Sequence, residues 1–489
     1  MFVMKSLGRR PTFVLAIVIA AGLGLPVPNA AAQDAKRKTV FRAGAATTDI
    51  SPWLGMSMNG GMSDNKALFV HDPLRVRAMV LDDGTSSLAF VLCDSCMVPR
   101  EVVAAAKTRI KERSGIDADH VVISATHAHS CPTLASVFQS DPDPSFVEFH
   151  ALRIADAVQI AKANLAPAKI GWGVGSNSEQ VFNRRWKMKP GTIFSDPFGN
   201  GTDTVRMNPT PGSPDLVEPA GPIDPEVSII SVQTTEGKPL ALLANYSLRY
   251  VGGVGPGHSS ADYFGAFADR VQQLMNADRR DPPFVAMMTN GTSGDINNIN
   301  FRTPGASLPP YGKINLVADA LAKEAVRVAE TIEHRDHAKL DARTAELSLG
   351  VRKPTQEEID RAETIVSKAK GPVMRTIEEI YARETLLITK YPDTVPVTVQ
   401  AMRVGGLAVV AIPCEVFVEI GLAIKEKSAV KPVFTISLAN GYNGYLPTRE
   451  QHKLGGYETW RARSSYLEVG ASEAITAKAL ELLSGLKTD

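Results

Sequence analysis

The sequence predicts an α/β fold with a mixed central sheet flanked by helices. The first observation is that apolar runs typical of strands alternate with helical segments along residues 39–166. The second is that polar side chains directly follow several of these strands, as ligand-binding groups do in α/β sheets. The third is the composition, since 44% hydrophobic and 21% charged residues in a chain of 489 are ordinary for a globular protein.

A targeting segment is expected before this fold. Basic residues precede the apolar run 12–25 (TFVLAIVIAAGLGL), and small residues at 30–32 offer an A-x-A cleavage site before Gln33. We therefore expect residues 1–32 to be a secretory signal peptide and residues 38–489 to form the exported protein, periplasmic or extracellular, with no transmembrane span. A retained N-terminal anchor is the alternative.

The first half of the chain is predicted to contain strands, helices and a hairpin. The Asp-Asp-Gly sequence between two β-type runs indicates the hairpin, and a helix is indicated by a proline near its start and basic residues late. The predicted strands are residues 39–52, two runs within 74–93, and 120–126, which ends at His127. The predicted helices are residues 99–114 and 145–166.

The second half contains further strands and a charged helical insertion. Residues 187–226 are rich in Gly, Pro, Asp and Thr, which predicts a long loop that forms a rim or lid. The insertion, about residues 354–390, is charged and interrupted by Gly-Pro, so it is interpreted as a solvated helical hairpin. The other predicted elements are strands at 227–234, 240–248 and 284–290, a helix at 263–277, and a hairpin at 397–417.

Charge and cysteine content restrict the function. With 53 basic and 52 acidic residues, the net charge of +1 provides no electrostatic case for nucleic acid, and no protein partner is evident. Cys93 and Cys96 are packed thiols or a local disulfide, because no second pair completes a four-cysteine zinc site. Three interpretations of Cys131 and Cys414 are open. They form a disulfide with each other, Cys414 binds a metal, or both are small buried hydrophobic side chains.

Ligand-type side chains follow four apolar runs. They are His127 and His129, the turn 290–300, Glu415, and residues 440–450. Side chains of this kind at several strand ends suggest one shared pocket. Imidazole and carboxylate groups are suited to a zinc ion, which would activate water for attack on a carbonyl.

Two further groups near these runs have open roles. Asp94 follows another strand and either orients His127 or caps the next helix. Asn290, Asn297, Asn298 and Asn300 form either a hydrogen-bonding wall for a substrate or an ordinary turn.

Five motifs together resemble the neutral (non-lysosomal) ceramidase family, and more closely its shorter bacterial secreted members, over most of residues 40–475. The motifs are ATHAHSCP, FNRR, TNGTSGDINN, IPCEVFVEIG and NGYNGYLPTREQHKLGGYE. The resemblance implies a ceramidase-like catalytic domain that uses one zinc ion per chain to hydrolyse the amide of ceramide. It also implies that the immunoglobulin-like C-terminal domain of full-length ceramidases is missing here.

The resemblance assigns roles to individual residues. His127, Glu415 and Tyr445 match zinc ligands of the family. His129, Arg184 and Tyr457 match groups that hold the substrate or stabilise the oxyanion, a role that suits a cation and a phenol in a dry site.

Two positions depart from the family pattern. The serine of the family falls on Asn297, whose amide cannot replace a hydroxyl as nucleophile. The second zinc histidine falls on Arg249, which cannot deprotonate to bind a metal and would repel a dication. His258 or Asp262, on the same connection, could supply the replacement ligand, and we expect His258.

Two functions follow as expectations. The first is an exported metal-dependent hydrolase that cleaves an amide or ester bond of a small-molecule or lipid substrate, such as a sphingolipid. The alternative is a catalytically inactive, metal-free ligand-binding protein on the same fold, which Asn297 and Arg249 favour.

Overall fold

The computed structural model describes residues 40–487 apart from residues 194, 279, 282 and 307. All of them lie in one compact unit, Thr39–Asp489. The signal peptide expected at residues 1–32 lies outside the described residues. Among the residues described, no helix combines the length and the apolar character needed to cross a membrane.

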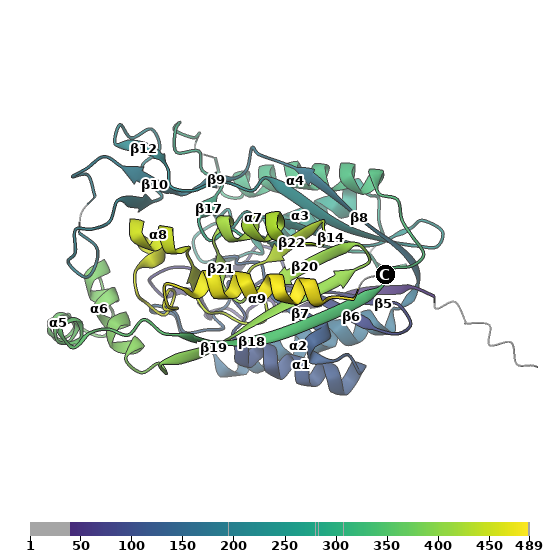
Figure 1. The fold of residues 1–489 in the computed structure, drawn as a ribbon, viewed down its shortest axis with the longest axis horizontal. Coiled ribbons are helices and arrows are strands. Elements are labelled where there is room, and N and C mark those ends of the chain that lie inside the picture. The colour runs from purple at the N-terminus through teal and green to yellow at the C-terminus, as the bar shows by residue number, and fades with distance from the viewer. Residues whose placement is uncertain (1–39, 194, 279, 282, 307, 488–489) are drawn as a thin grey trace, which may run out of the picture. The chain divides into compact units, whose positions relative to one another are not determined.

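A mixed sheet of eight strands forms the centre of the unit (Figure 1). Its two parallel pairs are β14 with β16 and β6 with β7, and the other neighbours are antiparallel. The predicted fold class is therefore confirmed. In sheet order, the strands are β16 (Val285–Asn290), β14 (Pro239–Tyr246), β13 (Glu226–Thr234), β8 (Ala166–Ser176), β1 (Arg42–Asp49), β5 (Arg75–Asp82), β6 (Ser87–Cys93) and β7 (Val121–Ala125).

A second sheet of four strands packs against one face of the first. Alternate side chains of β5 point to its two faces, so Met79 and Leu81 meet Met402 and Phe434 of the second sheet in a shared core. This packing explains the long apolar runs of the sequence. The strands are β18 (Leu340–Gly350), β19 (Thr394–Val404), β20 (Leu407–Ala411) and β22 (Val433–Ile436).

Helices cover the outer faces of both sheets and complete four layers. The face of the large sheet opposite the shared core carries α1 (Arg100–Ser114), α2 (Pro144–Ala163), α3 (Asp262–Leu274) and α4 (Gly312–Thr331). The small sheet is covered by α7 (Val418–Lys427) and α9 (Ala471–Gly485), the latter drawn in yellow in Figure 1.

Local sequence signals explain where the helices begin and end. α1 starts directly after Pro99 and ends at Gly115, which adopts the left-handed conformation that a residue with a side chain rarely takes. α2 begins after Asp143, whose side chain accepts a hydrogen bond from the backbone of Ser145.

Two expectations about irregular segments need correction. The segment 187–226 is not only a loop, because it contributes most of a three-stranded sheet: β10 (Arg185–Met188), β11 (Val205–Met207) and β12 (Leu216–Pro219). The insertion forms α5 (Gln356–Ser367) and α6 (Ile377–Ile388), and α6 is not a solvated helix. It buries Tyr381 and Glu384, and Glu384 forms an ion pair with Arg463 at 2.7 Å.

The remaining elements are short. The strands are β2 (Ser57–Met58), β3 (Asn65–Lys66), β4 (Phe69–Val70), β9 (Phe182–Asn183), β15 (His258–Ser259), β17 (Ile296–Asn297), β21 (Glu415–Val416) and β23 (Tyr445–Leu446). The helices are α8 (Arg449–Leu454) and two 3-10 turns, η1 (Ala118–His120) and η2 (Tyr457–Thr459).

Hydrogen bonds join the segments that follow strands from the two sheets. The backbone of Leu438, after β22, accepts from Ala125 of β7 and donates to Cys414, which follows β20. Ser437 donates to Asn290, the last residue of β16, and the Asn290 amide donates to Thr126. The carboxyl ends of β7, β16, β20 and β22 therefore meet, which brings their polar side chains into one region.

Candidate functional site

His127 and His129 lie directly after β7. His127 adopts a left-handed backbone conformation with φ of 68°, which is uncommon for a residue with a side chain and is found at functional sites. Its Nδ1 atom lies 2.8 Å from the backbone oxygen of Cys96. The ring of His129 is stacked on Tyr250 at 3.6 Å between centroids, and its Nε2 lies 3.2 Å from His127 Nε2.

Glu415 and Tyr445 are neighbours because two short strands pair. β21 and β23 run parallel, and Glu415 is the partner of Tyr445 in their register. The hydroxyl of Tyr442 donates to Glu415 Oε1 at 3.2 Å. Backbone pairing of β21 with β23 thus places the Glu415 carboxylate beside the Tyr445 phenol.

Arg249 follows β14 and reaches the same point. Its Nη2 atom lies 2.8 Å from His127 Nε2 and 3.3 Å from both Glu415 Oε2 and the Tyr445 hydroxyl. The side chain is buried, with 3% of the residue exposed. A guanidinium therefore occupies the point on which an imidazole, a carboxylate and a phenol converge.

A buried network on the other side of Tyr445 contains Arg184 and Glu458. Arg184 Nη2 donates to the Tyr445 hydroxyl at 3.1 Å, and its Nε donates to Glu458 at 2.8 Å. The second oxygen of Glu458 accepts from Arg185 at 2.6 Å. Glu458 thus bridges two adjacent guanidinium groups and fixes the direction of Arg184. The ring of Tyr457 lies 5.8 Å from that of Tyr445.

The charges of these groups follow from their surroundings. Burial raises the pKa of Glu415, but its contacts with His127 and Arg249 outweigh burial and hold the pKa at about 2. Burial raises the pKa of the Tyr445 phenol to about 12 although Arg249 opposes this. Burial also lowers the pKa of His129 well below its usual range. At neutral pH the site therefore holds a carboxylate, neutral phenols, a neutral His129 and two guanidinium ions.

A carbonyl, a guanidinium and a carboxylate contact the ring of His127. Nδ1 faces a backbone carbonyl, which only accepts, so Nδ1 carries a proton. Nε2 lies 2.8 Å from the Arg249 Nη2 group, which only donates, and 3.1 Å from Glu415 Oε2, which only accepts. The imidazole thus joins the guanidinium and the carboxylate in one buried network.

A zinc ion at the three expected ligands does not fit this arrangement. His127, Glu415 and Tyr445 do converge, but the Arg249 group fills the point between them and lies 2.8 Å from His127 Nε2. Zinc binds about 2 Å from its nitrogen and oxygen ligands, so it would require the same space. A guanidinium also cannot lose its proton to become a ligand.

A second donor set in the same region could hold a metal ion. It consists of Cys96, His127 and His129, whose ligand atoms all lie within 4.8 Å of one another. Cys96 Sγ is 3.7 Å from His127 Nδ1. Burial raises the pKa of the Cys96 thiol, which opposes the thiolate that a metal would need.

Other residues singled out in the sequence lie in different surroundings. Both ends of the Asn297 amide are engaged, with Asn208 at 2.7 Å and the backbone of Ile299 at 3.0 Å. His258 Nδ1 lies 2.6 Å from the Tyr311 hydroxyl, and its ring packs 4.8 Å from Phe69. The structure therefore directs His258 into an aromatic cluster rather than to the donors around Arg249.

The cysteines and Asp94 also have defined partners. All four thiols are free and buried, so neither a Cys93–Cys96 nor a Cys131–Cys414 disulfide is present. Asp94 neither orients His127 nor caps α1. Its carboxylate accepts from Arg77 at 2.7 Å and from the backbone of Arg75 at 2.9 Å.

Several members of the site were missed by sequence reasoning. Tyr442 lies within the motif NGYNGYLPTREQHKLGGYE and Tyr250 directly follows Arg249, but nothing in their spacing indicates that their rings line the site. Glu458 directly follows Tyr457, and its charge next to a predicted site residue was the available signal. Gly60 also packs on His129, since a Cβ atom there would lie 2.5 Å from His129 Cβ.

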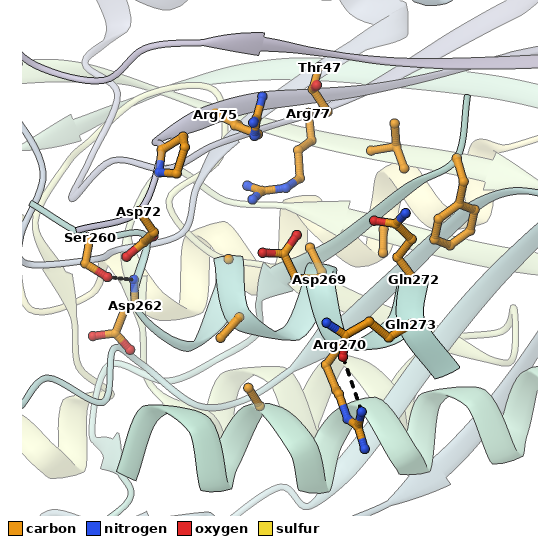
Figure 2. Close-up of a pocket in the computed structure, with 18 of the residues that line it drawn as sticks. Thr47, Asp72, Arg75, Arg77, Ser260, Asp262, Asp269, Arg270, Gln272 and Gln273 are labelled. Atoms are coloured by element: carbon orange, nitrogen blue, oxygen red, sulfur yellow. Dashed lines mark hydrogen bonds between the residues drawn. The ribbon is translucent and has the colours of Figure 1, made fainter. Parts of the chain in front are cut away.

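A separate cavity of about 820 Å³ lies between the large sheet and α3. Figure 2 shows Arg75 and Arg77 of β5 on one wall and Asp269 of α3 on the opposite wall. None of the described residues that line it belongs to the site around Arg249. Asp262 connects the two regions, because it lines the cavity and accepts from the backbone of Val251 and Gly252, just after Tyr250.

Comparisons with known proteins establish the fold. No protein-family model matches the chain. The neutral ceramidase from Pseudomonas aeruginosa superposes with a TM-score of 0.68 at 19% identity, covering 91% of this chain and 74% of that chain. A structure titled "Ceramidase complexed with C2" has the same TM-score at 16% identity, with 91% and 75% covered. The chain therefore has a ceramidase-like fold.

Proposed function

We propose that the chain binds an amphiphilic, lipid-like ligand at the site around Arg249, without a metal ion. One observation carries this proposal: the Arg249 Nη2 group lies 2.8 Å from His127 Nε2 and 3.3 Å from both Glu415 and Tyr445. A fixed positive charge at this point takes the place of a metal ion and is neutralised in part by Glu415.

The lipid-like character of the ligand is supported by the fold and by the side chains around the site. The structural neighbours are a neutral ceramidase and a ceramidase complexed with C2. Partly buried apolar and aromatic side chains continue from the site into an apolar cluster, among them Met62, Phe198, Tyr457 and Trp460. An apolar wall beside charged groups suits a ligand with a polar head and an apolar chain.

A metal-dependent hydrolase is the second candidate function. It is favoured by the Cys96, His127 and His129 group, whose ligand atoms are close enough to share an ion. In such an enzyme, Arg184 and Tyr457 would stabilise the oxyanion of an amide or ester. The candidate requires the Arg249 side chain to leave its present position, since its charge would repel the ion.

Metal content separates the two candidates. We expect the purified chain to retain no zinc after dialysis, and we expect Arg249→His to gain zinc because an imidazole replaces the guanidinium. Elemental analysis would be run beside His127→Ala and beside assays on amide and ester lipids. About one zinc per wild-type chain, lost in His127→Ala and accompanied by hydrolysis, would favour the hydrolase and overturn the metal-free proposal.

We also infer that the chain is exported, because residues 1–32 have the pattern of a signal peptide. Expression in a bacterium should yield a mature chain that begins at Gln33 in the periplasm or the medium. N-terminal sequencing of the secreted chain checks this, and an uncleaved chain that stays with the membrane fraction would indicate a retained anchor.

A further inference from the structure

We propose that the ligand of this site is a single-chain amphiphile with a carboxylate head group, held between Arg184 and Arg249. The inference rests on the proposed binding function and names the chemistry of its ligand. It depends on where the two guanidinium groups point and on which carboxylates already neutralise them.

Two cations converge on one uncharged atom. Arg184 Nη2 and Arg249 Nη1 lie 3.1 and 3.3 Å from the hydroxyl oxygen of Tyr445. A phenol hydroxyl is a weak partner for two guanidinium ions, and an anionic oxygen would be a stronger one.

The carboxylates present do not fully satisfy these guanidinium groups. Glu415 accepts from Arg249 at 3.3 Å, which is longer than the usual charge-assisted hydrogen bond of about 2.7–2.9 Å. Glu458, by contrast, pairs with Arg184 at 2.8 Å and with Arg185 at 2.6 Å. Of the two site arginines, Arg249 therefore has the weaker ion pair.

Arg249 also has an unused donor. Its Nε atom is buried and has no hydrogen-bond partner among the described residues. A buried N–H without an acceptor costs free energy, so a ligand that supplied acceptor oxygens to this guanidinium would be favoured. Two further carboxylates, Asp203 and Asp295, interact with Arg185.

The surroundings limit the ligand to one with an apolar chain. His129, Tyr250, Tyr442 and Tyr457 keep partial exposure and form the side of the site that borders solvent. Tyr442 and Tyr457 also belong to the apolar cluster with Met62, Phe198 and Trp460. A carboxylate at the arginines would place an attached chain along these side chains.

A neutral amide fits the same position less well. An amide carbonyl can accept from one guanidinium, but it brings no charge and its N–H₂ group would face further donors. Charge-assisted hydrogen bonds contribute more than neutral ones, so a carboxylate should bind at least about tenfold more tightly than the amide of equal chain length.

The test compares matched ligands on the full exported chain. Decanoate, decanamide and decanol, each below its micelle concentration and at neutral pH, would be titrated into the protein by calorimetry. We expect decanoate to bind most tightly, by about tenfold or more over decanamide. Arg249→Gln should reduce that ratio to near one, and Arg335→Gln, which removes a half-exposed arginine elsewhere, should leave it unchanged.

Each outcome distinguishes the inference from the proposed function. If decanamide or decanol binds as well as decanoate, the carboxylate inference is wrong and amphiphile binding stands. If none of the three binds, both the inference and the binding function fail. Because the ligand comparison uses the wild-type chain, it remains decisive even if Arg249→Gln does not fold.

Discussion

At the scale of single residues, Arg249 has the largest effect on what the site can do. Its sequence neighbours form an ordinary strand end, and only the folded chain shows that its guanidinium lies between His127 and Glu415. The sequence places an arginine where the resembling family has a zinc-binding histidine, and the structure shows the geometric consequence. The guanidinium not only replaces a ligand but also fills the space where an ion would bind.

Removing the Glu458 carboxylate should destabilise the protein strongly. Glu458→Gln leaves Arg184 and Arg185 buried with an uncompensated charge, which typically costs about 3–5 kcal/mol. Guanidinium chloride unfolding would measure the change. Glu473→Gln is the matched control, because Glu473 pairs with Arg449 at the surface, and a loss there should stay within about 1 kcal/mol. Equal losses in the two variants would contradict the role of the buried network.

Asp295 should make stability depend on pH. Burial raises its pKa to about 6, so the native state holds a proton that the unfolded chain releases near its usual pKa. Between about pH 4 and pH 6 the native state binds more protons, and stability therefore falls as pH rises through this window, by up to about 3 kcal/mol.

Asp295→Asn should remove that slope. The variant loses the hydrogen bond from Asn183 and is expected to be less stable at every pH. The change of the unfolding free energy with pH, and not its absolute value, is therefore the readout. Urea unfolding between pH 4 and pH 7 measures it, with the exposed Asp393→Asn as control. A wild-type slope that persists in Asp295→Asn would show that other groups cause it.

At the scale of elements, the strands were the more predictable part. β1, β5, β6, β7, β13, β14 and β16 were expected close to their observed bounds, because apolar runs and turn residues mark them. The insertion was expected as a solvated hairpin because of its charges. Its second helix, α6, is instead buried through Tyr381 and Glu384, since a charged residue can be buried when it meets a partner such as Arg463.

The cap of α6 should contribute measurably to stability. Thr376 accepts from the backbone of Glu379, and the Glu379 side chain accepts from the backbone of Thr376, which is a capping box. Thr376→Ala should cost about 1 kcal/mol in chemical denaturation, whereas Thr376→Ser should cost a few tenths because its hydroxyl can cap. If the serine variant is as unstable as the alanine variant, the lost methyl group matters more than the cap.

At the scale of the whole molecule, burial of the thiols distinguishes this fold from a disulfide scaffold. Cys93, Cys96, Cys131 and Cys414 are free and buried, and burial raises the pKa of each thiol. A thiol reagent such as DTNB should therefore react with none of them in the native chain and with all four in guanidinium chloride. Fewer than four reactive thiols after unfolding would indicate a disulfide that the structure does not contain.

The sequence by itself determined the class of fold and most of the strands, because apolar periodicity and turn residues act over a few positions. It also placed His127, His129, Glu415 and Tyr445 after apolar runs, which is where a ligand site forms in an α/β sheet. Only the tertiary structure decided the relation between these side chains and Arg249. Contacts between residues more than a hundred positions apart depend on how two sheets pack, and that packing places a guanidinium rather than a vacant ligand set at the centre of the site.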